Sequence, residues 1–391
     1  MKIISDNPNN LLEKLELAKK QLKNAKNREE QLALTTYIHQ LKVAIYDSFP
    51  GTIPKPKYYN NKKNRVYNKK FTNHEEKMVE NFAHYKDFHE EFFEPIRKVT
   101  VHELRKYDDG NYSGITDLSE KEFYEIFFDF MAKLGLDKYF DKFIRGRRLY
   151  SIEKELGEED EFSKTSEGYI AHNPINKDND IFMRKLRYDI WSMHYLAHEF
   201  GHVYDLNHFD EDITSFNIYN YESFNKEVIP MTFERLFLDH LIENNILVEE
   251  AKDQFFDMNY IYYEFILSAY IISLIPHKYF DKELHLSFSS NKLFEMVGNH
   301  FSRNDLVKKF INKLDALDTQ DTYSYAYGDV FSLFFKERIK EDNYSLDSLK
   351  EFFELRSKPF DPKILEKLDI NRKEYVKLYK KDMQLLKKES N

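Results

Sequence analysis

Two histidines four residues apart, with a glutamate directly after the first, lie inside an apolar stretch that has helical periodicity. The stretch reads WSMHYLAHEFGHVYDL, and the three residues are His198, Glu199 and His202. Four residues of an α-helix turn through about 400°, so both imidazoles project from one face and can bind a single metal ion. Glu199 lies one step further round the helix and can reach the open coordination side. The pattern therefore requires a helix here and predicts a metal centre on it.

The rest of the chain also favours helices. Its 391 residues include ten glycines and ten prolines, and hydrophobic residues make up 41%, which is enough for a sizeable core. The exception is the polar stretch 146–180, in which GYIAHNPINKDND (168–180) predicts a strand followed by a turn. We therefore expect a mostly α fold with a small β-sheet near the metal-binding helix. The edge of such a sheet could pair with an extended peptide.

The chain is expected to divide into two parts. Residues 1–72 would form an N-terminal helical segment, with a helical hairpin over 9–48, followed by a basic linker. The linker, 50–71, has three prolines and no acid, which predicts an exposed connection; the alternative is a docking strip for an acidic partner. Residues 73–391 would form the catalytic domain, with its zinc core at about 150–340 and C-terminal helices over 341–391.

Local signals mark several helix starts and the hairpin turn. Asn and Lys residues around 24–27 predict the turn. The helix starts are indicated by a capping residue followed three positions later by Glu, or by a proline in the first turn: Ser119 with Glu122, Asn371 with Glu374, and Asp361 before Pro362.

Composition argues against several classes of protein. A net charge of −9 offers no general positive face for nucleic acid, and the absence of cysteine excludes disulfides and thiol chemistry. The most apolar run, 260–275, is shorter than the roughly 20 residues of a membrane span and is interrupted by Glu264, so we expect a buried helix and no membrane partner. The N-terminus lacks the apolar core of a signal peptide. We therefore expect a cytoplasmic protein, and export by a route that needs no signal peptide is the alternative.

The third metal ligand must come from outside the helix that carries the histidines. Glu222 and Glu227 compete for this role, since both follow at spacings that a downstream ligand can have. Glu222 lies in the loop-like IYNYESFN, whereas Glu227 opens the strongly amphipathic EVIPMTFERLFLDHLI. The context favours Glu227. Two histidines and a carboxylate favour one zinc ion (Zn²⁺), with Glu199 as the general base.

Three further residues could support the ligands from behind. Glu234 lies seven residues after Glu227 on the same helix face and could orient a ligating histidine; a partly buried helix carboxylate is the alternative. Asp205 follows His202 by one turn and has the same two interpretations. His194 lies one turn before His198, where the helix face drifts away from the metal, so a supporting or core role is expected.

At this point the chain resembles the M3 family of zinc peptidases, the group of oligoendopeptidase F and thimet oligopeptidase. The resemblance covers roughly residues 150–385. It rests on LAHEFGHVYD (196–205), on EVIPMTFE (227–234), although Pro230 stands where a small polar residue is usual, and on TYSYAYGDVFSLFF (322–335) with the tail that follows. The resemblance implies a two-lobed, mostly helical zincin-type metallopeptidase with a substrate channel. It also implies His198, His202 and Glu227 as the metal ligands.

The tyrosine segment has a chemical role in this resemblance. A phenol beside the metal can donate a hydrogen bond to the oxyanion of a tetrahedral intermediate. The family's pattern favours Tyr325, with Tyr323 and Tyr327 as neighbours. On a helix Tyr323 and Tyr327 share a face and Tyr325 points elsewhere, so at least one of the three must pack in the core.

Two departures from the family are visible in the sequence. The family's histidine upstream of these tyrosines is missing from LVKKFINKLDALDTQD, and His300 is the nearest earlier one. The chain is also shorter before the metal motif, which implies a reduced channel lobe. The expected activity is zinc-dependent hydrolysis of short unstructured oligopeptides. The alternatives are a dedicated protease for one substrate, such as an effector or maturation enzyme, or a catalytically weak zincin that binds peptides or proteins.

Overall fold

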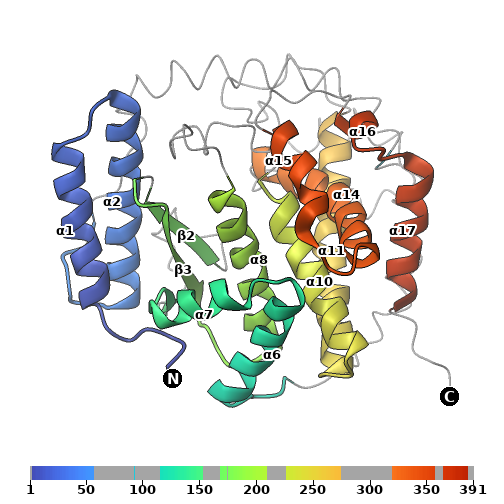
Figure 1. The fold of residues 1–391 in the computed structure, drawn as a ribbon, viewed down its shortest axis with the longest axis horizontal. Helices are drawn as coiled ribbons and strands as arrows, with labels where there is room; N and C mark the ends of the chain where they lie inside the picture. Colours follow the sequence, from blue (N-terminus) through green and yellow to red (C-terminus); the bar gives the residue numbers. More distant parts are fainter. Residues whose placement is uncertain are drawn as a thin grey trace, which may run out of the picture.

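The computed structural model describes residues 2–56, 92, 115–152, 168–173, 175–208, 226–273, 319–356 and 364–385. These residues form a mostly helical protein with one small sheet (Figure 1). The elements follow one another as α1 (Asn9–Lys23), α2 (Arg28–Ser48), α6 (Glu120–Lys133), α7 (Asp137–Arg145), β1 (Leu149–Ile152), β2 (Gly168–Asn173), β3 (Asp178–Arg184), α8 (Ile190–Asn207), α10 (Val228–Glu243), α11 (Val248–Ser273), α14 (Thr319–Glu341), a 3₁₀ turn (Leu346–Leu349), α15 (Lys350–Arg356), α16 (Ile364–Lys367) and α17 (Arg372–Leu385).

The sheet has the strand order β1-β3-β2, with β1 parallel and β2 antiparallel to β3. GYIAHN forms β2 and is followed by a turn, as its sequence predicts. In the part of the chain that the structure describes, β2 is an edge strand of the sheet. The sequence did not single out β1, which is four residues long and pairs with a strand about thirty residues further along.

Both faces of the sheet are buried, because successive side chains of a strand point to opposite sides. One face packs under the α1–α2 hairpin and forms a separate apolar cluster that includes Tyr150 and Phe182, stacked at 5.0 Å between ring centroids. The other face, with Ile181 and Met183, belongs to the main core beside α8. The sheet therefore separates the N-terminal hairpin from the helices that carry the candidate metal ligands (Figure 1).

The hairpin is held to the sheet by a buried charge as well as by apolar packing. Asp180 on β3 is fully buried and pairs with Lys14 from α1. Burial raises the pKa of Asp180, and Lys14 opposes that rise. The predicted hairpin over 9–48 is therefore confirmed, with its turn between Lys23 and Arg28.

The helix-start signals behave as the sequence indicates. Ser119 and Glu122 form a reciprocal capping box at the start of α6. Asn371 accepts a hydrogen bond from the backbone of Glu374 at 3.0 Å, one residue before α17 begins. Asp361 and Pro362 lie outside the described residues, as do positions 57–71 of the expected linker and the boundary at 72–73.

The apolar run at 260–275 is helical as far as residue 273, where the description of α11 ends. Most of its described side chains are buried, including Tyr262 and Ile266. Among the described residues, no helix combines the length and the apolar character that crossing a membrane would require.

Candidate metal centre

Helices α8 and α10 meet at a glycine. A Cβ atom on Gly201 would lie 2.5 Å from Cα of Pro230, so the two backbones can approach this closely because Gly201 has no side chain. Pro230 costs α10 no hydrogen bond because it lies in the first turn, where backbone N–H groups have no intrahelical acceptor. A second glycine, Gly328 of α14, lies against α10 and would place a Cβ 3.1 Å from that of Glu227. Three helices thus converge at Glu227.

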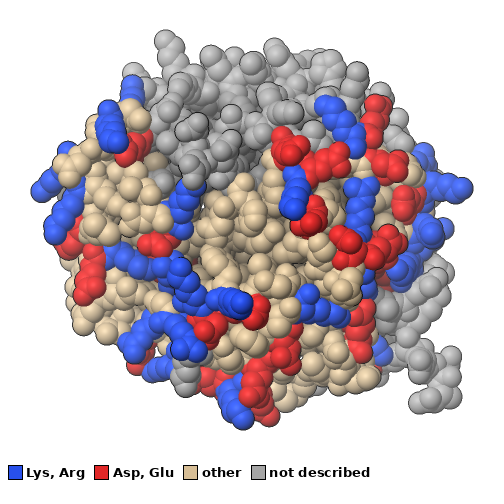
Figure 2. Space-filling view, viewed as in Figure 1, with Lys and Arg blue, Asp and Glu red and all other residues tan. Residues whose placement is uncertain are grey.

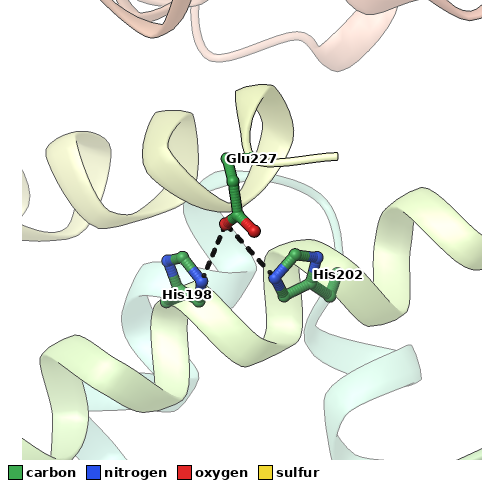
Figure 3. A group of neighbouring side chains, drawn as sticks. All are labelled: His198, His202 and Glu227. Carbon is green, nitrogen blue, oxygen red and sulfur yellow. Dashed lines mark ion pairs between the residues drawn. The ribbon is translucent and has the colours of Figure 1, made fainter. Parts of the chain in front are cut away.

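This packing brings together the two histidines of α8 and the glutamate that precedes α10 (Figure 3). The buried Oε2 atom of Glu227 lies 3.3 Å from Nε2 of His198 and 3.5 Å from Nε2 of His202. Tetrahedral ligands at zinc distances of about 2.0–2.1 Å lie about 3.3–3.4 Å from one another. The three side chains therefore fit one metal ion.

The centre is buried but open on one side. The side chains of His198 and Glu227 are 9% and 5% exposed, whereas that of His202 is 23% exposed. Glu199 lies beside the ligands with its carboxylate against the first residue of β2, where a Cβ on Gly168 would meet its Oε1 at 2.6 Å. Burial raises the pKa of Glu199, and the two imidazoles oppose that rise. Glu222 lies outside the described residues.

A carboxylate holds the far side of the His198 ring. Nδ1 of His198 lies 2.8 Å from Oε1 of Glu234, and Tyr262 of α11 donates a hydrogen bond to Oε2 of the same carboxylate. A carboxylate in this position fixes the orientation of a ligating imidazole and raises its basicity. Glu234 therefore lies beside His198, as its spacing of seven residues from Glu227 predicts. No spacing rule in the sequence indicates Tyr262.

His194 lies behind this arrangement. Its Nδ1 accepts a hydrogen bond at 3.1 Å from the Gln254 amide, and its Nε2 is 3.9 Å from Glu234. Burial lowers the pKa of His194 to about 4, although Glu234 opposes that shift, so the ring is neutral near neutral pH. This agrees with the supporting role expected for His194. Asp205 is buried on the same helix, and its predicted role stays a prediction.

Without a metal, the negative charge of the carboxylates in this centre is balanced by protons on neighbouring groups. Burial lowers the pKa of His198, but Glu234 and Glu227 outweigh burial and leave it well above its ordinary value. Burial raises the pKa of Glu227, and the two imidazoles outweigh that effect, so it lies well below its ordinary value. A metal ion and a proton therefore compete for the same nitrogens.

Helix α14 brings one of the three tyrosines to this centre. The Tyr325 ring lies 6.4 Å from that of His198, with the planes inclined by 19°, and it packs on Phe265 at 4.6 Å. Tyr327 is fully buried in the core, as at least one of the three had to be. The side chain of Tyr323 lies outside the described residues, as do His300 and residues 306–318.

Comparison with known proteins adds little to this geometry. No family model matches the sequence, and no curated protein matches it. A crystal structure of a “putative peptidase” from Chlamydophila abortus matches the fold with a TM-score of 0.45 and 14% identity, over 96% of this chain and 62% of that one. This chain thus spans less than two thirds of that protein. Similarity at this level carries no argument about activity, which must rest on the side chains themselves.

Proposed function

We propose that the chain is a zinc-dependent peptidase that hydrolyses short unstructured oligopeptides, with the two-lobed, channelled architecture of the M3 family. The observation that carries the proposal is the cluster of His198, His202 and Glu227 beside Glu199. The distances of 3.3 and 3.5 Å between Glu227 and the two imidazoles match a tetrahedral zinc site. A zinc ion held there would polarise the scissile carbonyl and lower the pKa of water.

The chain's own groups would move the proton and hold the substrate. Glu199 takes a proton from the attacking water and passes it to the leaving amine. Tyr325, stacked near His198, is the donor for the developing oxyanion. An extended peptide would pair with β2, an edge strand among the described residues, whose first residue lies against the Glu199 carboxylate. Glu234 keeps His198 in its ligating orientation throughout.

The test is hydrolysis of a quenched-fluorescent peptide library by the zinc-loaded protein, beside the Glu199→Gln variant and a chelated sample. Removing the general base should lower turnover by about 10² to 10⁴-fold while leaving the zinc content at one ion per chain. Chelation should abolish turnover in the wild type and be reversed by zinc. Equal rates in the variant and the wild type would refute the proposed mechanism.

A different result would favour the other readings of the same site. Zinc bound at one ion per chain with no cleavage of any library peptide would refute the oligopeptidase proposal. A dedicated protease for one protein, or a zincin that binds peptides without cutting them, would then be the better account of the intact ligand set.

A further inference from the structure

Helix α8 is buried on all sides except along one stripe. Of its residues up to Leu206, four are partly exposed and the others are buried; the four are Trp191, Tyr195, His202 and Leu206. At about 100° per residue these four positions lie within about 60° of one another around the helix axis. Over this length, α8 is therefore accessible to solvent and to a substrate only on this one stripe of its surface.

His202 belongs to this stripe, and His198 and Glu199 flank it. His198 is about 20° to one side of Trp191, and Glu199 is about 80° to the other. Along the axis Trp191 precedes His198 by about 10 Å, and Tyr195 precedes it by about 4–5 Å. One residue of an extended peptide spans about 3.3 Å, so a peptide at the metal centre that runs along this stripe passes the two rings about one to three residues from the scissile bond.

The two rings form a fixed apolar surface. Trp191, the one tryptophan in the sequence, is 36% exposed, and its ring lies 5.6 Å from that of Tyr195. From behind, the buried His194 ring supports Tyr195 at 5.4 Å, and His194 is in turn held by Gln254. Because both rings stand on an otherwise buried helix, they are held in place before any ligand arrives.

The stripe itself carries little charge. None of its four residues is Lys, Arg, Asp or Glu. Figure 2 shows a largely uncharged surface between the N-terminal hairpin and the C-terminal helices, with charged side chains around it. An aromatic pair in such a setting gains free energy by covering a large apolar side chain.

We propose that Trp191 and Tyr195 form the subsite that binds a large apolar side chain of the peptide substrate, aromatic or leucine-like, about one to three residues from the bond that is cut. The inference rests on the proposed function, since it takes the metal centre as the place of cleavage. It assigns Trp191 and Tyr195 to substrate selection and leaves the chemical step to Glu199.

Because Trp191 is the single tryptophan, its fluorescence reports binding at the proposed subsite directly. Zinc-loaded Glu199→Gln protein is mixed with blocked peptides of Ala, Gly and Ser in which one Phe is moved through every position, and with the parent peptide without Phe. Excitation at the red edge of the tryptophan band avoids the 28 tyrosines. A Phe at the right position should change the Trp191 emission saturably and bind about tenfold more tightly than the parent.

Labelled copies of the same peptides allow variants without tryptophan to be compared by fluorescence anisotropy. Trp191→Ala and Tyr195→Ala should each remove most of the preference for Phe, and Trp191→Phe should retain much of it. Leu17→Ala on α1 is the matched control, because Leu17 is a 43% exposed apolar residue far from α8 in the sequence. In active protein, Trp191→Ala should raise KM for Phe peptides several-fold and change kcat little.

The outcomes separate the inference from the proposed function. Equal binding of Phe and parent peptides, or an unchanged preference in Trp191→Ala protein with an unchanged melting temperature, would overturn the subsite even if peptides are cleaved. The Trp191 emission of the Glu199→Gln protein could instead respond saturably to Phe peptides, and Tyr195→Ala could abolish that response, while the wild type cleaves no peptide. This result would support the subsite and overturn the peptidase.

Discussion

Helix α10 separates two buried polar clusters that differ in how their charges are balanced. Glu234 faces the metal centre, while its neighbour Arg235 is fully buried and pairs with Asp329 of α14 and Asp382 of α17. Further along, Lys336 pairs with Asp382 at 2.5 Å and with Asp239 at 3.4 Å. Arg235 has two aspartate partners and Lys340 also pairs with Asp239, so three cations face three aspartates and the Arg235 cluster is neutralised by the chain itself.

The metal centre has no such balance. Glu199, Glu227 and Glu234 surround two imidazoles that must be neutral to act as ligands. Lys226 reaches Glu227 at 3.8 Å, but its side chain is 42% exposed and therefore solvated. Buried charge without a partner is costly, so this cluster is completed from outside the chain, by a proton or by a metal ion, whereas the Arg235 cluster is complete without one. We therefore place the proposed function at this incomplete cluster.

Breaking the Arg235 cluster should give the largest loss of stability. Arg235→Met leaves Asp329 buried without a cation and Asp382 with Lys336 alone, which should lower the free energy of unfolding by about 3–5 kcal/mol. Arg145→Met is the matched control, because Arg145 is 71% exposed and pairs with Asp141 on its own helix, and it should cost no more than about 1 kcal/mol. Urea unfolding of the metal-free proteins measures both. A loss of zinc from the folded variant would contradict a purely structural cluster.

A smaller effect is expected from the carboxylate behind His198. Glu234→Gln keeps the shape but loses the charge, and should weaken zinc binding about 10–100-fold. Tyr262→Phe removes one hydrogen bond to Glu234 and should weaken it less. Asp239→Asn, further along the same helix in the Arg235 cluster, should lower stability and leave zinc affinity unchanged. Competition against a chromophoric chelator at fixed pH measures the zinc affinity of all three variants. Equal zinc affinities for Glu234→Gln and Asp239→Asn would contradict the assignment of metal binding to one cluster and stability to the other.

Local signals in the sequence were enough to predict much of the site. The spacing of His198 and His202 fixes both side chains on one helix face, and the amphipathic start of α10 selects Glu227. Glu234 follows from Glu227 because two turns of helix return to the same side. Each of these inferences depends on geometry within one helix, and the structure brings the residues together.

The remaining parts depend on contacts between elements, for which the sequence contains no spacing rule. Tyr262 and Gln254 reach the centre because α11 packs beside α8 and α10, and nothing in their own segment marks them. Arg235 and Asp239, four residues apart, would ordinarily indicate a solvated helix face, yet both are buried because α14 and α17 cover them. The short strand β1 likewise needs the distant β3 to exist.

The smallest predicted effect lies at the exposed rim of the Arg235 cluster. Burial alone would raise the pKa of Glu243, but hydrogen bonds from Lys340, Tyr344 and Lys133 lower it to about 2. An unfolded chain titrates Glu at about 4.3, so this carboxylate stabilises the fold above that pH and stops doing so as the pH falls through about 2. Glu243→Gln should therefore be less stable than wild type near neutral pH, and the two should converge at about pH 2, because a protonated Glu resembles Gln. Urea midpoints at stepped pH measure this, with the exposed Glu249→Gln as control. A stability difference between the two proteins that stayed constant with pH would mean that Glu243 contributes through packing. The ion pairs that stabilise the Arg235 cluster would then be limited to its buried residues.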